Sequence, residues 1–122
     1  MRTNNDLSYF SLNNENKDTH QKLHSFKSLD TGWCYGEGVP ISEAIVALAC
    51  QLNDAAWSTG FHATDAFPGI DGGISLTLYQ GEDFYEFILK HEGTITFIHE
   101  RGDQEIEYLE SIAAQTALAL IN

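Results

Sequence analysis

The chain has 122 residues, 43% of them hydrophobic, which suffices for one modest core and leaves no room for a second domain. Its formal net charge is −12 at pH 7, and residues 28–122 hold fifteen acidic residues against only Lys90 and Arg101. Proteins bind nucleic acids and anionic lipids through clustered Lys and Arg, so this charge argues against both partners and favours a basic one, if it does more than keep the protein soluble.

The sequence carries no signal for secretion or membrane insertion. Its first twenty residues lack an apolar signal-peptide core, and no apolar run is long enough to span a bilayer, so we expect a cytoplasmic protein. Cys34 and Cys50 stand in unrelated contexts without CxxC spacing, which gives no reason to predict a disulfide or a zinc site.

The N-terminal part divides into a polar tail and a short helix. Residues 1–17 are rich in Asn and Ser and too polar to build a core, so they are predicted to be a disordered tail before a single α+β domain at 18–122. In residues 19–29, Leu23, Phe26 and Leu29 recur every three positions, which favours a short amphipathic helix capped by Thr19.

A glycine-punctuated aromatic loop follows at residues 32–38. Its indole and phenol, Trp33 and Tyr35, either pack beneath the next helix or anchor an interface, and packing is favoured for Trp33. The next helix begins after Pro40 with Ser42 as N-cap and ends at residues 58–60. Its narrow apolar stripe is rich in alanine, and Cys50 reads as a small buried side chain.

Residues 74–99 predict a three-stranded antiparallel meander. Strands at 74–79, 84–89 and 94–99 alternate apolar and polar residues, and the loops at 80–83 and 91–93 set their register. The register predicts one apolar face with three cross-strand rows, in which Gly93 takes the left-handed position of the second loop. The rows are Ile74/Leu89/Ile95, Leu76/Phe87/Phe97 and Leu78/Tyr85/His99.

Two further elements complete the predicted fold. Residues 62–67 could add a short edge strand, and the spacing of Ile106, Leu109 and Ile112 predicts a helix capped by Asp103 that runs nearly to the C-terminus. We therefore predict a two-layer α+β fold of order α-β-β-β-α: a three-stranded meander, or a four-stranded one with residues 62–67, packed on an N-terminal-side and a C-terminal helix.

No catalytic residue, cofactor site or metal site is predicted. His20 and His24 have metal-pair spacing, but no third ligand is near them in sequence. His99 lies in the core-facing row opposite Tyr85, where a hydrogen-bonded structural imidazole is usual, and Cys34 could act as a nucleophile only if the fold brought His62 or His99 to it.

Residues 32–42 (GWCYGEGVPIS) and 64–73 (TDAFPGIDGG), together with the meander, resemble a group of small prokaryotic proteins found in cyanobacteria and on mobile elements. The resemblance covers about residues 22–110 and implies the same order of helix, turn-rich loop, sheet and final helix. It implies no activity, and the Asp that commonly follows the Trp of that group is here Cys34.

Three functional hypotheses follow. The first is a non-enzymatic protein-binding or regulatory module that self-associates through the outer face of the sheet. The candidate interface residues on that face are Tyr79, Phe84, Ile88 and Ile98, and Trp33 and Tyr35 of the aromatic loop are further candidate interface residues. The second is an antitoxin- or immunity-like acidic inhibitor of a basic nucleic-acid-binding protein. The third is a small hydrolase or metal-dependent enzyme that uses Cys34, a histidine and the acidic turns.

Overall fold

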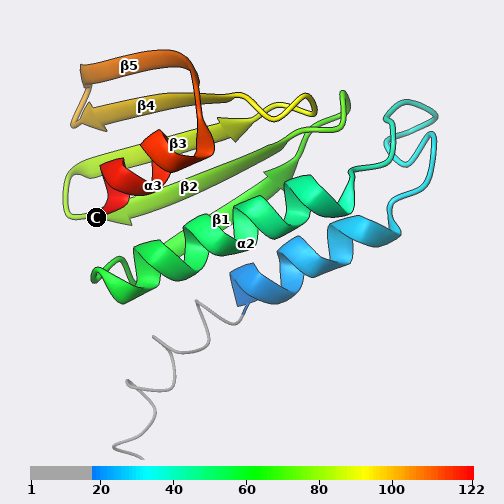
Figure 1. Ribbon diagram of the computed structural model, residues 1–122, viewed down its shortest axis with the longest axis horizontal. Coiled ribbons are helices and arrows are strands. Elements are labelled where there is room, and N and C mark those ends of the chain that lie inside the picture. The colour runs from blue at the N-terminus through cyan, green and yellow to red at the C-terminus, as the bar shows by residue number, and fades with distance from the viewer. Residues whose placement is uncertain (1–17) are drawn as a thin grey trace, which may run out of the picture.

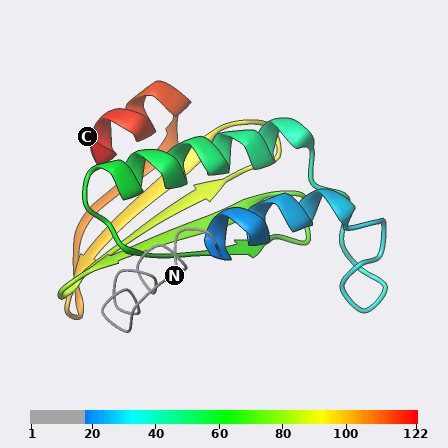
Figure 2. The same cartoon turned by 90° about the horizontal axis from the view of Figure 1, so that it is seen from below.

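The computed structural model describes residues 18–122, so the predicted disordered tail at 1–17 lies outside the described residues. The described residues form an α+β fold with one five-stranded antiparallel sheet in the order β1-β2-β3-β4-β5 and helices packed on one of its faces (Figures 1 and 2). None of the described helices is long and apolar enough to cross a membrane. The elements are a helix over residues 18–25, η1 (Phe26–Ser28), α2 (Glu43–Ser58), β1 (Ala63–Pro68), β2 (Ile74–Gln80), β3 (Asp83–Leu89), β4 (Ile95–Arg101), β5 (Gln104–Ile112) and α3 (Ala114–Ile121).

The predicted meander is confirmed in its register. Leu76 pairs with Phe87, and Phe87 pairs with Phe97, so all three predicted rows stand across β2, β3 and β4. Gly93 has a φ of 102°, which is the left-handed conformation expected of it. The apolar rows are buried against α2, because every side chain of this face projects toward the helical layer.

The predicted edge strand exists as β1, which pairs antiparallel with β2 over its whole length. Together with β5 it makes the sheet five-stranded, so the prediction of three or four strands is wrong in number.

The prediction of one helix from Asp103 nearly to the C-terminus is wrong over residues 104–112, which form β5. Its last part is confirmed as a shorter C-terminal helix, α3. Gly102 and Asp103 make a two-residue hairpin turn between Arg101 and Gln104, in which Gly102 has a φ of 60°. The pairing of β5 with β4 shifts register twice, so Leu109 and Ile112 oppose Phe97 and Ile95 although they are three residues apart. Each bulge adds one residue to the period of two, which imitates helical spacing in the sequence.

Helix α2 forms as predicted. The Ser42 side chain accepts a hydrogen bond from the Ile45 backbone nitrogen at 3.2 Å, and Thr59 closes the C-terminal end. The buried side of α2 includes Ala49 and Ala56, whose small side chains let the helix lie close to the sheet, and Cys50 is only 8% exposed.

The helix over residues 18–25 lies beside α2 (Figure 2). Leu23 and Phe26 are buried, as their spacing predicts. Thr19, expected as the N-cap, lies inside the helix instead and donates a hydrogen bond from its hydroxyl to the Thr64 carbonyl on β1 at 2.9 Å.

Candidate functional site

The sheet face opposite the helices carries a row of partly exposed apolar side chains, which we call the outer face. The cross-strand pair Tyr79 and Phe84 lies at one end of it, and Ile88 and Ile98 lie near its centre. The same face extends onto both edge strands, where Phe67 is 46% and Tyr108 is 47% exposed. All four interface residues predicted from the sheet therefore lie on one surface that no described element covers.

Carboxylates stand among these apolar side chains. Glu100 pairs directly with Glu105 across β4 and β5, and like charges in that arrangement repel. The Tyr108 hydroxyl donates to Glu110 at 2.8 Å; this hydrogen bond, followed by desolvation and by the charges of Glu110 and Glu105, raises the pKa of Tyr108. Glu86 adds a further charge near the centre and accepts from the Ser75 hydroxyl.

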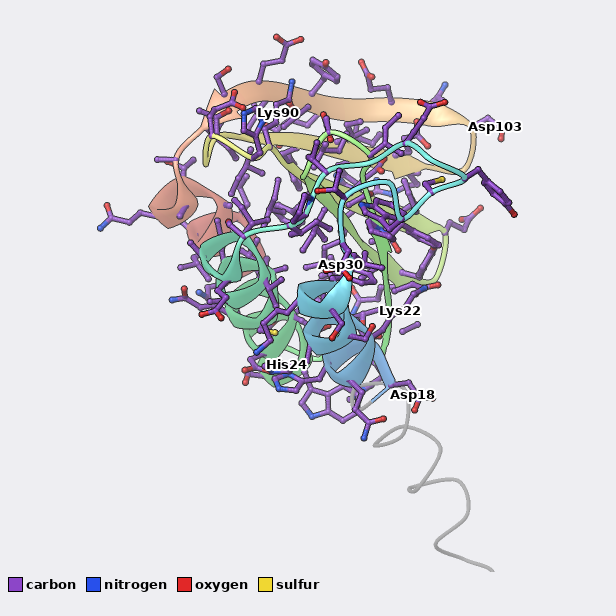
Figure 3. All side chains as sticks on the ribbon, turned by 90° about the vertical axis from the view of Figure 1, so that its right-hand side faces the viewer. Asp18, Lys22, His24, Asp30, Lys90 and Asp103 are labelled. Carbon is purple, nitrogen blue, oxygen red and sulfur yellow. The ribbon has the colours of Figure 1, made fainter. Side chains whose placement is uncertain are left out.

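Bases are scarce on the outer face. Within the described part of the chain, Lys90 lies directly after β3 and lines a groove with Phe67 and Ile88 at the margin of this face. Arg101 alternates to the other side of the sheet and pairs with Asp83 at 2.9 Å. At the β1 margin, Lys22 pairs with Asp65 at 2.9 Å and stands 4.5 Å from the Phe67 ring centre. Figure 3 shows Lys22 and His24 projecting from different sides of their helix, with Lys22 directed away from α2.

The aromatic loop at residues 32–38 lies at one end of the molecule, away from the β2–β3 turn (Figure 1). Trp33 donates from its indole nitrogen to the Val39 carbonyl at 2.9 Å and contacts Gly38, so it folds back on its own loop. Tyr35 is fully exposed, with a φ of 53°. These two predicted interface residues thus occupy a site separate from the outer face, where only Tyr35 presents its ring freely.

A cavity of about 260 Å³ lies under α3 on the helix-covered face. His99 lines it, opposite Tyr85 as the register predicts, and contacts Asp83 at 2.8 Å through its Nε2. Hydrogen bonds from His99 and Arg101 lower the pKa of Asp83. The imidazole is thereby held in a hydrogen-bonded pair at the wall of the cavity.

Neither Cys34 nor His62 lines this cavity. Cys34 pairs with Glu37 inside the aromatic loop, and His62 packs edge-on against Trp57 with ring centres 4.8 Å apart. The loop that carries Cys34 and the β2–β3 turn beside His99 lie at opposite ends of the molecule (Figure 1), which leaves the nucleophile hypothesis without a base for Cys34 in that cavity.

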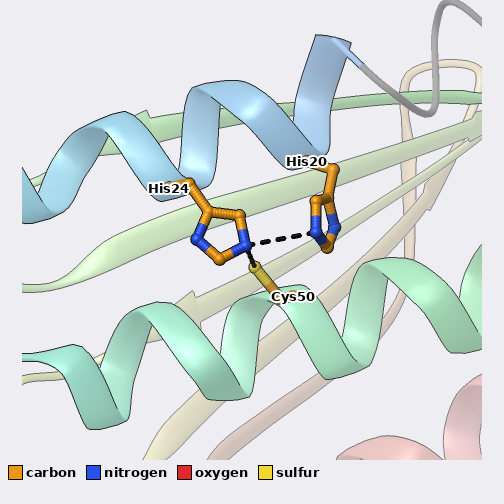
Figure 4. Close-up of side chains that lie close together, drawn as sticks. All are labelled: His20, His24 and Cys50. Carbon is orange, nitrogen blue, oxygen red and sulfur yellow. Dashed lines mark hydrogen bonds between the residues drawn. The ribbon is translucent and has the colours of Figure 1, made fainter.

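A second cluster joins the N-terminal helix to α2. His20 and His24, one turn apart, bring their Nε2 atoms to 3.1 Å, and the Cys50 sulfur of α2 lies 3.9 Å from His24 Nε2 (Figure 4). Asp54, one turn beyond Cys50, places Oδ1 3.7 Å from His20 Nδ1. Burial and then the charge of Asp54 raise the pKa of the Cys50 thiol, an effect that Lys27 partly offsets.

Only the two histidines of this cluster could be paired from the sequence. The four-residue spacing of the two histidines was visible, but their third neighbour comes from a helix that begins nearly twenty residues later. A matching four-residue spacing, Cys50 to Asp54, was the signal that could have pointed to it.

Comparison of the chain with models of known protein families, with curated proteins and with solved structures gave no match.

Proposed function

We propose that this protein is a non-enzymatic binding module whose outer face docks a positively charged segment of another protein. The observation that carries the proposal is a combination on one face that no described element covers. Partly exposed aromatic and aliphatic side chains lie there beside Glu86, Glu100 and Glu105, which form no ion pair within the described residues. Aromatic anchors supply contact area in protein interfaces, and surrounding charges select the partner.

The charge of the outer face favours a basic partner over a second copy of the chain. In a symmetric dimer each copy presents the same patch to the other, so the carboxylates of both copies, two of Glu100 and two of Glu105 among them, would gather in one interface. A partner with Lys or Arg would instead neutralise this pair and relieve the repulsion already present between the two strands.

The edge strand β5 also favours a basic partner over a second copy of the chain. Strand β5 places Glu105, Glu107 and Glu110 along nine residues, and its pairing with β4 contains two register shifts. Charges and bulges on an edge strand oppose pairing between identical edges. A basic segment would be attracted by the carboxylates of β5 rather than repelled by them.

The test measures binding of a fluorescently labelled peptide of alternating Lys and Val by anisotropy. The wild-type chain is compared with Glu100→Gln/Glu105→Gln and with Asp30→Asn/Glu37→Gln, a control that removes the same charge around the aromatic loop. We expect the outer-face variant to bind about tenfold more weakly and the control to bind nearly as the wild type does. Ile98→Ser should weaken binding as well, and raised salt should weaken it further.

Two results would contradict the proposal. One is equal loss of affinity in both double variants, which would mean that the peptide senses only net charge. The other is sedimentation of the wild type as a dimer that Ile98→Glu dissociates, which would assign the outer face to a second copy of the chain.

A further inference from the structure

We propose that His20, His24 and Cys50 form a Zn²⁺ site between the N-terminal helix and α2, with Asp54 as the carboxylate that orients His20. This inference does not rest on the proposed binding function, because the cluster lies in the helical layer and the outer face lies on the other side of the sheet.

The sequence of the two helices places the ligands in register. Residues four apart on a helix lie one above the other on the same side, so His20 and His24 project together from one helix and Cys50 and Asp54 from the other. Leu23 and Phe26 bury themselves against the core, which fixes the N-terminal helix beside α2 and turns the two imidazoles toward the thiol (Figure 4).

The distances fit tetrahedral coordination. Zn–N bonds of about 2.0 Å and a Zn–S bond of about 2.3 Å put neighbouring ligand atoms about 3.3 Å (N to N) and about 3.5 Å (N to S) apart. The separations here are 3.1 Å between the two Nε2 atoms and 3.9 Å from His24 Nε2 to the Cys50 sulfur. The ligand atoms of all three residues lie within 4.8 Å of one another. Metal binding would therefore bring the His20 ring and the Cys50 sulfur closer by up to about 1.3 Å, a movement that rotation of the solvent-accessible imidazole side chains allows.

Asp54 supplies the partner that a histidine ligand needs. Its carboxylate faces His20 Nδ1 at 3.7 Å, while His20 Nε2 faces His24. A carboxylate on one ring nitrogen keeps the proton there and leaves the other nitrogen free to bind metal. This arrangement makes Asp54 a positioning residue rather than a ligand.

The surroundings favour a cation with an open coordination position. The cluster borders a groove of about 430 Å³ lined by Glu43 and Asp54 as well as by Lys27, so acids outnumber bases there. Three protein ligands leave a fourth position of the tetrahedron for water, and His24 is exposed to solvent on that side.

The ligand set selects the metal. Imidazole and thiolate ligands suit Zn²⁺ and related transition metals, whereas Mg²⁺ and Ca²⁺ prefer oxygen ligands. On binding, a Zn–S bond forms as the Cys50 thiol releases its proton to solvent, with no change of oxidation state. The bound metal would clamp the N-terminal helix to α2 and so stabilise the fold.

The experiment uses the full chain, purified without a histidine tag and kept reduced. Titration with Co²⁺ should give a thiolate-to-cobalt charge-transfer band at one equivalent, together with the strong visible bands of a tetrahedral site, and Zn²⁺ should abolish both. Zn²⁺ should raise the melting temperature by at least about 5 °C, whereas Mg²⁺ should not.

Matched variants locate the site. Cys50→Ser should abolish the charge-transfer band and Cys34→Ser should retain it. His24→Ala should weaken Zn²⁺ binding at least about a hundredfold, while His62→Ala leaves it unchanged. Asp54→Asn should weaken binding about tenfold but keep the band, as expected for a residue that only positions a ligand.

His24 is exposed, so His24→Ala should fold even where Cys50→Ser does not. A charge-transfer band that survives Cys50→Ser, or wild-type Zn²⁺ affinity in a folded His24→Ala protein, would overturn the assignment.

Discussion

The backbone of β5 can be tested at Ser111, which has a φ of 55° at the bulge opposite Ile95 and Phe97. An L-residue in this left-handed conformation costs about 1–2 kcal/mol, and a β-branched side chain is rarer still there. Ser111 is exposed, so substitutions at this position change the backbone energy and bury almost no new surface.

The structure predicts opposite effects for two substitutions. Ser111→Gly removes the left-handed penalty at a cost of about 0.5–1 kcal/mol in chain entropy, so it should leave stability unchanged or raise it by up to about 1 kcal/mol. Ser111→Val should lower stability by about 1–2 kcal/mol, or roughly 4–8 °C in melting temperature. Gln104→Val, an exposed substitution at an ordinary β5 position, serves as the control and should be nearly neutral.

Urea denaturation followed by circular dichroism measures these differences. If residues 104–112 formed the helix that their spacing suggests, the order would reverse: Gly would lower stability by about 0.5 kcal/mol and Val would match Ser. A wild-type midpoint for Ser111→Val together with a lowered one for Ser111→Gly would therefore refute the bulged strand.

Three further predictions concern packing and charge. Phe87→Ala should cost about 3–5 kcal/mol in urea denaturation, since the ring is 1% exposed at the centre of the middle apolar row. Gly38→Ala should shift the fluorescence of Trp33 to longer wavelength, because φ is 103° there and a Cβ would lie 2.7 Å from the indole nitrogen. Asp83→Asn should lower the melting temperature at pH 7. Hydrogen bonds hold the pKa of Asp83 in the folded protein below its ordinary 3.8, so the ionised carboxylate stabilises the fold fully above pH 3.8. The difference in melting temperature between wild type and variant should therefore shrink as the pH is lowered below 3.8.

The meander could be read from the sequence because its information is local. Short hairpin loops tie each strand to the next, and shifting one by a single residue would turn Leu76, Phe87 and Phe97 to the outer face. The helix cap at Ser42 is local as well, since its partner is only three residues away.

Strand β5 could not be predicted from the sequence because its two bulges interrupt the alternation of apolar and polar residues that is typical of a strand. Leu109 and Ile112 are three residues apart and both face the core, which is typical of a helix. The turn at Gly102 and Asp103 was the contrary signal, since Gly-Asp between two apolar segments is also a hairpin turn. An Asp at this position is compatible both with a helix N-cap and with a hairpin turn, and the hairpin turn is the one that forms.

The candidate sites depend on contacts between distant parts of the chain. The four apolar residues of the outer face were predicted together, but its extension to Tyr108 required the strand that was missed. Likewise, spacing placed His20 beside His24, whereas Cys50 joined them only through the packing of two helices. Local sequence patterns therefore predict single helices and strands, whereas both candidate sites combine residues from helices or strands that are distant in the sequence.

The two proposed sites should act independently because the sheet separates them. The histidine and cysteine ligands lie in the helical layer, and the apolar core of the protein fills the space between α2 and the sheet. Loss of metal would loosen the N-terminal helix, which reaches the outer face only at its β1 margin through Lys22. Substitutions at Glu100 and at His24 should therefore have additive effects on stability, and a coupling above about 0.5 kcal/mol would indicate that the helical layer communicates with the outer face.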